Sequence, residues 1–151
     1  MHRLYETEDI VVFWNSDKCR HAKKCVTGSP VTFDFQRRPW IDLTQAPTMK
    51  IWQTVKSCPS GALGCVYTHD VVIVLEAESF KSAAYKDGRL IGECVYEDGT
   101  EGRVIYHTGV DEAFTGRGIA KRLVYKVVEK AERSGAEVSA TCPYAAKVLA
   151  E

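Results

Sequence analysis

Cys19-Arg20-His21-Ala22-Lys23-Lys24-Cys25 and, further along, Cys58-Pro59-Ser60-Gly61-Ala62 are the two stretches that decide the fold of the first half of this chain. Cysteine thiolates with this kind of spacing, the last followed by a proline, are typical ligands of iron–sulfur clusters. A bound cluster helps to stabilise a domain too small to bury a large core. Because both stretches fall before residue 63, we expect two modules, of which only the first binds a cluster.

Length and composition indicate a soluble globular protein. The chain has 151 residues, which allows one domain of ordinary size or two of minimal size. It is 45% hydrophobic and 26% charged with no net charge, which argues against a dedicated nucleic-acid binder or a polybasic membrane-docking protein. There is no apolar run of roughly 20 residues and no apolar signal-peptide core at the start. We therefore expect a cytoplasmic protein without nucleic-acid or membrane partners, of undetermined oligomeric state.

The cysteines favour metal binding or catalysis over disulfides. In the reducing cytosol, thiols that cluster in sequence are more often ligands or nucleophiles than disulfide partners. Their distribution agrees, because four of the six fall within the first 65 residues. The six are Cys19, Cys25, Cys58, Cys65, Cys94 and Cys142.

The first half is predicted to combine short strands with one helix. β-Branched and aromatic residues predict a strand over residues 9–14. Pro47 suits the first turn of a helix over residues 47–56, whose apolar residues share one face. Cys58 lies one turn beyond Val55 on that face, so the helix can deliver its sulfur to the same side. Further extended segments are expected at residues 31–35, 37–41 and 63–67.

The boundary between the two domains is predicted to follow a buried strand near the middle of the chain. Residues 71–75 are apolar throughout, which predicts a buried strand. Glu76-Ala77-Glu78-Ser79 is the expected boundary, so the domains are residues 1–75 and 76–151.

The rest of the second half predicts hairpins followed by helices. Asp87-Gly88 and Asp98-Gly99 are strong hairpin dipeptides. Apolar residues repeat every four positions over residues 118–134, and Gly135 is placed to end that helix. Strands are expected at residues 80–86, 90–97, 103–107 and 138–141, with a last helix at residues 144–151. This order predicts an α+β fold, a sandwich with a mixed, mostly antiparallel sheet.

The cysteine motif leaves the cluster type and its fourth ligand open. Ala22 stands midway between Cys19 and Cys25, where a third thiolate of the loop would be expected. Three thiolates could hold a [3Fe–4S] cluster, or a [4Fe–4S] cluster whose fourth iron takes His21 or Cys65. The alternatives are a zinc-stapled domain, or surface thiols with a core cysteine. The cations Arg20, Lys23 and Lys24 would favour the reduced state of an anionic cluster.

Residues 9–67 resemble the divergent single-cluster ferredoxin domains of bacteria. The motifs that carry the resemblance are Trp14-Asn15-Ser16-Asp17-Lys18-Cys19-Arg20-His21, Arg38-Pro39-Trp40-Ile41 and Cys58-Pro59-Ser60-Gly61-Ala62-Leu63. The resemblance implies a ferredoxin-like fold with metal ligands Cys19, Cys25 and Cys58. The position of His21 is commonly histidine in that family, which implies His21 as fourth ligand.

The loop before the long helix of the second half suits a phosphate. The first turn of a helix offers free amide donors and a positive dipole end. Gly116 and Gly118 would let the backbone curl around a pyrophosphate, and Arg117, Lys121 and Arg122 add positive charge. The loop is not a P-loop, because no Lys-Ser/Thr pair follows the glycines. By itself the glycine pair is equally compatible with a plain strand-to-helix turn.

Residues 79–151 resemble minimal members of the GNAT acetyltransferase superfamily. The resemblance rests on Tyr106-His107-Thr108, Val110-Asp111-Glu112-Ala113-Phe114, Gly116-Arg117-Gly118-Ile119-Ala120-Lys121 and Thr141-Cys142-Pro143-Tyr144. It implies that acetyl-CoA binds with its pyrophosphate on the Gly116–Lys121 amides and its acetyl end near Val110. Thr115 departs from the superfamily, where Gln or Arg is usual.

The resemblance also implies three catalytic candidates. Cys142 would approach the acetyl group, either accepting it covalently or, as the preferred reading, lining the pocket. Tyr144 is the usual kind of general acid, although it could be a core aromatic. His107 could be the base, although a histidine at a strand end is often structural.

Two functions of different class follow. The leading one is a CoA-dependent N-acetyltransferase fused to an iron–sulfur domain that modulates it by redox state, with a small-molecule or protein amine as acceptor and a redox protein as partner. The alternative is an electron carrier or redox sensor whose second half binds CoA without turnover.

Overall fold

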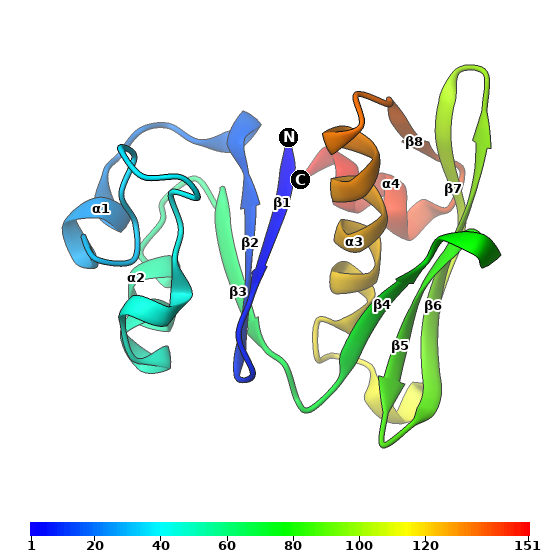
Figure 1. Cartoon of the computed structure of the whole chain (residues 1–151), viewed down its shortest axis with the longest axis horizontal. Coiled ribbons are helices and arrows are strands. Elements are labelled where there is room, and N and C mark those ends of the chain that lie inside the picture. Colours follow the sequence, from blue (N-terminus) through cyan, green and yellow to red (C-terminus); the bar gives the residue numbers. More distant parts are fainter. The chain divides into compact units, whose positions relative to one another are not determined.

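The computed structural model describes residues 1–151, which divide into two compact units, formed mainly by residues 3–68 and 69–151 (Figure 1). The division precedes β4 (Val72–Glu76), earlier than the expected boundary after residue 75. The reason is that β4 pairs along its whole length with β5 (Lys81–Lys86) of the second unit. No helix of the structure has both the length and the apolar character of a bilayer span.

The first unit is built on a three-stranded sheet in the order β1 (His2–Glu6), β2 (Ile10–Asn15), β3 (Leu63–Tyr67). β2 and β3 are antiparallel, so the predicted strands 9–14 and 63–67 are confirmed. β1 was not expected, because its mostly polar residues carry no apolar alternation. The connections contain α1 (Lys24–Gly28) and α2 (Thr48–Lys56), and the latter matches the predicted helix 47–56.

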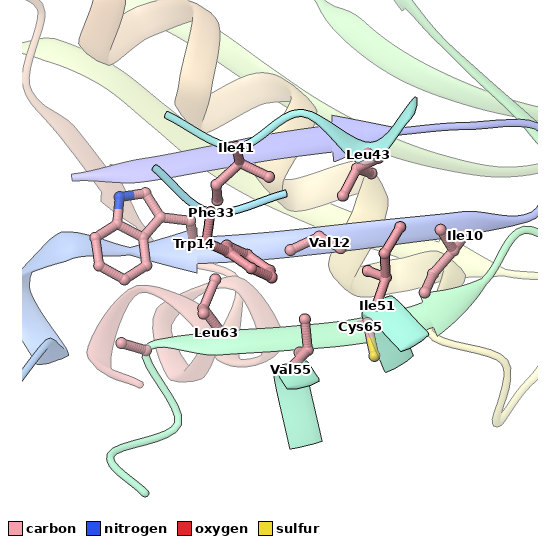
Figure 2. Close-up of a cluster of buried hydrophobic side chains, with 11 residues drawn as sticks. Ile10, Val12, Trp14, Phe33, Ile41, Leu43, Ile51, Val55, Leu63 and Cys65 are labelled. Carbon is pink, nitrogen blue, oxygen red and sulfur yellow. The ribbon is translucent and has the colours of Figure 1, made fainter. Parts of the chain in front are cut away.

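The core of the first unit lies between the sheet and α2. Ile10, Val12 and Trp14 alternate along β2 and point into this core (Figure 2). Ile51 and Val55 of α2 meet them, each 1% exposed. The remaining labelled side chains come from the loop and from β3: Phe33, Ile41, Leu43, Leu63 and Cys65. Burial of this apolar surface is what fixes α2, and with it the turn that carries Cys58.

The expected extended segments 31–35 and 37–41 do not form strands. A single bridge joins Phe33 to Ile41, and the chain between them forms turns. Arg37 holds this loop closed, because its guanidinium donates to the carbonyls of Val31 (2.9 Å) and Thr32 (2.7 Å). The side chain thus satisfies the Val31 carbonyl and gives a second donor to the Thr32 carbonyl, which also accepts from the Asp42 amide at 2.9 Å.

The second unit has a five-stranded sheet in the order β4-β5-β6-β7-β8. β6 (Arg89–Gly99) and β7 (Gly102–Val110) continue the antiparallel part, and β8 (Val138–Ala140) is parallel to β7. α3 (Ile119–Arg133) lies across one face of this sheet, and α4 (Pro143–Ala150) packs against α3, β7 and β8 (Figure 1). The mixed, mostly antiparallel α+β sandwich is therefore confirmed.

Two local predictions in the second unit need correction. β4 is an edge strand rather than a fully buried one, since Ile73 is buried while Val72 and Val74 are exposed. The β6–β7 hairpin turns at Thr100-Glu101 and not at Asp98-Gly99. Asp98 stays in the ladder because it pairs with Arg103, whose Nε lies 2.8 Å from the carboxylate.

Gly102 starts β7 with a φ of 118°, and a Cβ there would collide with the carbonyl oxygen of Glu137. We predict that Gly102→Ala lowers the free energy of unfolding by about 3 kcal/mol, because strain and a backbone clash add. Gly88 is the matched control: its φ is 77°, but a Cβ there would meet nothing within 4 Å. Gly88→Ala should cost only about 1 kcal/mol. Urea denaturation measures both, and equal costs would refute the clash.

Candidate functional site

Three cysteines of the first unit line one pocket: Cys19, Cys25 and Cys58. Cys19 ends a short 3-10 turn, Cys25 lies in the first turn of α1, and Cys58 follows the C-terminus of α2. Burial raises the pKa of the Cys25 thiol, and the nearby sulfurs of Cys58 and Cys19 raise it further. Segments more than 30 residues apart thus bring three thiols within electrostatic reach of one another.

Backbone and hydroxyl donors surround two of these sulfurs. The amide of His21 donates to Cys19 Sγ at 3.4 Å, and Ser60 Oγ lies 3.6 Å from Cys58 Sγ. Burial would raise the pKa of Cys58, but the amides of Leu63, Ser60 and Gly61 and the Ser60 hydroxyl together hold it below its usual value. Donors aimed at sulfur stabilise the thiolate, which is the form that binds iron.

The pocket brings the thiols together without forming a single-ion site. No group of three or more His, Cys, Asp or Glu side chains is placed to hold one metal ion. In a cluster each thiolate binds a different iron, so the sulfurs stand farther apart than around a single zinc. A pocket with thiols around its wall and amide donors behind them has the chemistry that an anionic cluster needs.

The two candidates for the fourth ligand lie in different places. His21 is exposed, has a left-handed φ of 56° and lines the thiol pocket. Cys65 is 5% exposed in β3 and packs in the apolar core, outside that pocket (Figure 2). The position of His21 is therefore compatible with the role, whereas the Cys65 side chain serves packing.

Substitution of the pocket cysteines should remove the cluster. We predict that Cys19→Ala, Cys25→Ala and Cys58→Ala each abolish the visible thiolate-to-iron absorption band of anaerobically purified protein. Cys65→Ala is the matched control and should keep the band, at a cost of about 1 kcal/mol in stability. A band that survives in Cys58→Ala but disappears in Cys65→Ala would contradict the assignment.

The second unit has a pocket over the N-terminus of α3. It is lined by Val110 and Phe114, by residues 115–116 and 118–120, and by Tyr144. Gly116 and Gly118 have φ of 79° and 75°, so the loop turns through left-handed conformations before the helix begins at Ile119. The amides of the first helical turn have no carbonyl partner within the helix and suit an anion. The Arg117 guanidinium lies 5.2 Å from the Phe114 ring centroid and flanks this loop.

β7 and β8 separate next to this pocket. Their parallel pairing ends at Ile105 opposite Ala140. The carbonyl of Ile105 then accepts from the amides of both Thr141 (2.9 Å) and Cys142 (3.2 Å), which turns the chain away from the sheet. β7 runs on to Val110 without β8 beside it, so the edge of its last residues is open to a ligand.

Cys142 and Cys94 share the hydroxyl of Thr108. Cys142 Sγ and Cys94 Sγ each lie 3.6 Å from Thr108 Oγ1. Burial raises the pKa of Cys94 to about 11. Burial also acts on Cys142, but the amides of Ala145 and Tyr144 at the start of α4, with the Thr108 hydroxyl, hold its pKa below the usual value. Cys142 is therefore the more readily ionised thiol. The sequence did not reveal this, because it predicted a role for the backbone of Thr108–Val110 but none for the Thr108 hydroxyl.

The other two catalytic candidates lie on different sides of β7. Tyr144 lines the α3 pocket, and burial and the charge of Glu151 raise its pKa, so its hydroxyl stays protonated near neutral pH. His107 is exposed and its Nε2 would lie 3.2 Å from a Cβ at Gly109. Because successive residues of a strand face opposite ways, His107 is on the face opposite Thr108 and Cys142. The structure therefore places Cys142 and Thr108 next to each other and places His107 on the other face of the strand, away from both.

The pH dependence of Cys142 alkylation tests the Thr108 hydrogen bond. Thr108→Val removes the hydroxyl and keeps the shape, so the pH midpoint for alkylation of Cys142 should move upward. Iodoacetamide labelling followed by mass spectrometry of the Cys142 peptide measures the midpoint. Ser139→Ala, an exposed hydroxyl on β8, is the control and should leave it unchanged. A midpoint unaffected by Thr108→Val would show that the hydroxyl does not act on this thiol.

Comparisons with known proteins agree with the two units. Residues 5–68 match a family described as a divergent 4Fe-4S mono-cluster, and residues 80–151 match one described as GCN5-related N-acetyl-transferase. An uncharacterized protein of Escherichia coli strain K12, YjdI, is 36% identical over 62 residues, which are 41% of this chain and 82% of that protein.

Solved acetyltransferases are also similar to part of the chain. A ribosomal-protein-alanine N-acetyltransferase from Brucella melitensis biovar Abortus 2308 is 27% identical, with 42% of this chain and 52% of that one covered and a TM-score of 0.39. Arabidopsis thaliana Naa50, in complex with the bisubstrate analogue CoA-Ac-MVNAL, is 25% identical over 36% of this chain and 40% of that one, with a TM-score of 0.31. The chain thus spans about half or less of the length of these two structures.

The first domain thus matches a divergent single-cluster iron–sulfur family, and the second domain, which follows it in the chain, matches the GCN5-related N-acetyltransferase family.

Proposed function

We propose that the first domain binds a [4Fe–4S] cluster through Cys19, Cys25 and Cys58, with His21 as the fourth ligand. The convergence of three thiols on one pocket is the observation that carries this proposal. The four-iron form follows the description of the matching family, and nothing in the comparisons favours a three-iron cluster. Such a cluster would accept and release one electron. An imidazole ligand would raise its potential relative to four thiolates.

The second domain is proposed to transfer an acetyl group from acetyl-CoA to an amine. The pyrophosphate would lie on the amides of residues 116–121, and the acetyl group at the open edge of β7, near Val110. The two elements meet in one pocket, which supports this placement. Amide donors at that edge would polarise the thioester carbonyl.

The reaction needs a nucleophile and an acid. The neutral amine attacks the thioester carbon, the C–S bond breaks, and the CoA thiolate takes a proton from Tyr144, whose raised pKa keeps it protonated. The proton lost by the amine passes to water, because His107, the expected base, lies on the opposite face of β7. Cys142 does not line the α3 pocket, but its Sγ lies 3.6 Å from Thr108 Oγ1, two residues before Val110. It would therefore lie beside the acetyl site, and its lowered pKa also permits the covalent alternative in which it carries the acetyl group.

The arrangement of two domains in one chain leads us to propose that the cluster modulates the transferase in the cytoplasm. The acceptor is a small-molecule or protein amine. A second function is favoured by one observation, the location of His107 on the face of β7 opposite Cys142, which leaves no base beside the acetyl site. In that case the second domain would bind CoA without turnover, and the protein would be an electron carrier or redox sensor.

Transfer assays distinguish these functions. We predict that wild-type protein acetylates at least one amine in panels of polyamines and lysine peptides, and that Tyr144→Phe reduces kcat about 10- to 100-fold with little change in KM. Tyr106→Phe, at an exposed tyrosine outside the pocket, is the control. Oxidised, reduced and cluster-free protein should differ in rate. Equal rates would remove the modulation, and CoA binding without any transfer would establish the second function.

A further inference from the structure

Three positively charged side chains without salt-bridge partners line the thiol pocket. Arg20, Lys23 and Lys24 are exposed and line the pocket, and no carboxylate lies within salt-bridge distance of any of them. Asp17, the one acidic residue of this segment, is already bound to the N-terminal ammonium at 2.7 Å. An exposed cation without a partner contributes nothing to the fold, so this charge is available to an external anion.

An exposed aromatic ring completes the rim. Phe35 lines the same pocket and is 43% exposed, although it is stacked on Trp40 with ring centroids 4.9 Å apart. Arg38 donates to the Phe35 carbonyl at 2.9 Å and adds a further exposed cation beside it. A rigid aromatic surrounded by charged side chains is the usual composition of a protein-binding hot spot and its rim. We call Arg20, Lys23, Lys24, Phe35 and Arg38 the cationic rim.

The charge of the first domain is polarised along β2. Glu6, Glu8 and Asp9 lie at the turn before β2, whereas the cationic rim follows the other end of that strand. The six residues of β2 separate the two ends by roughly 20 Å. An acidic partner is therefore attracted to the pocket end of the domain and repelled by its opposite end. A basic partner is attracted to the opposite end and repelled by the pocket end.

We propose that the cationic rim is the docking surface for an acidic electron-transfer protein. This rests on the proposed cluster: one electron leaves the reduced centre of the partner, a flavin or iron–sulfur protein, and enters the cluster, with no bond made or broken. A protein partner fits better than nucleic acid, because four of the five rim residues line one pocket and the same domain is acidic at its other end. Electron-transfer complexes are small and electrostatically steered, which suits a rim of this size.

Stopped-flow reduction of the full-length, cluster-loaded protein tests this. The probe is a reduced acidic flavodoxin. The opposite-charge control is oxidised cytochrome c, a basic protein that takes one electron from the reduced cluster. Arg20→Glu/Lys24→Glu should lower the association rate constant with flavodoxin about tenfold or more at low ionic strength, and the difference should vanish at high salt. Lys50→Glu changes an exposed lysine of α2 that does not line the pocket, and it should change this association rate constant little. With cytochrome c the double variant should associate faster.

Further readouts separate docking from other roles of these cations. Calorimetric binding of oxidised flavodoxin involves no electron transfer and should weaken in the double variant, even though the cluster potential measured by redox titration should also fall when these charges are reversed. Lys24→Gln, a milder change, should act in the same direction by about twofold. Unchanged association in the double variant, a slower rate without weaker calorimetric binding of oxidised flavodoxin, or binding of a DNA oligonucleotide in place of flavodoxin would each overturn the proposal. Protein without cluster absorption would instead refute the proposed function itself.

Discussion

The convergence of three thiols depends on the apolar core between β2, β3 and α2. Cys58 sits just beyond α2, and that helix is positioned by Ile51 and Val55 against the inward face of β2. Cys19 follows the end of the same strand, so one core sets both sides of the pocket. The cluster would in turn tie the two segments together, which makes ligand geometry and core packing mutually dependent in a domain of this size.

The second domain uses a different device, the separation of two parallel strands. β8 is short, and its last pairing at Ile105 leaves the end of β7 open beside the N-terminus of α3. An open strand edge and a helix N-terminus both offer amide donors, so one pocket can bind a carbonyl and a phosphate chain. The same divergence places Cys142 at the start of α4, where helix amides and Thr108 lower its pKa.

Most of the strands and helices could be predicted from the sequence. Some have a strong apolar periodicity, as in α3, and others are strands flanked by hairpin residues, as at Asp87-Gly88. Prediction from the sequence failed where tertiary contacts override local pattern. β1 is a strand only because it joins β2, and the loop after Phe33 is shaped by Arg37 binding carbonyls. The apolar residues of β4 predicted a buried strand, yet β4 lies at the edge of the sheet with Val72 and Val74 exposed.

For the sites, the spacing of the cysteines predicted which of them would line one pocket. It could not show that the Cys65 side chain packs in the apolar core, or that no carboxylate pairs with the cations beside the thiol pocket. Iron and acid-labile sulfide analysis of anaerobically purified protein, with electron paramagnetic resonance of the reduced form, shows whether the three thiols hold a cluster. We expect four irons and four sulfides per chain, in line with the 4Fe-4S description of the matching family. Stoichiometric zinc with no labile sulfide would contradict this expectation.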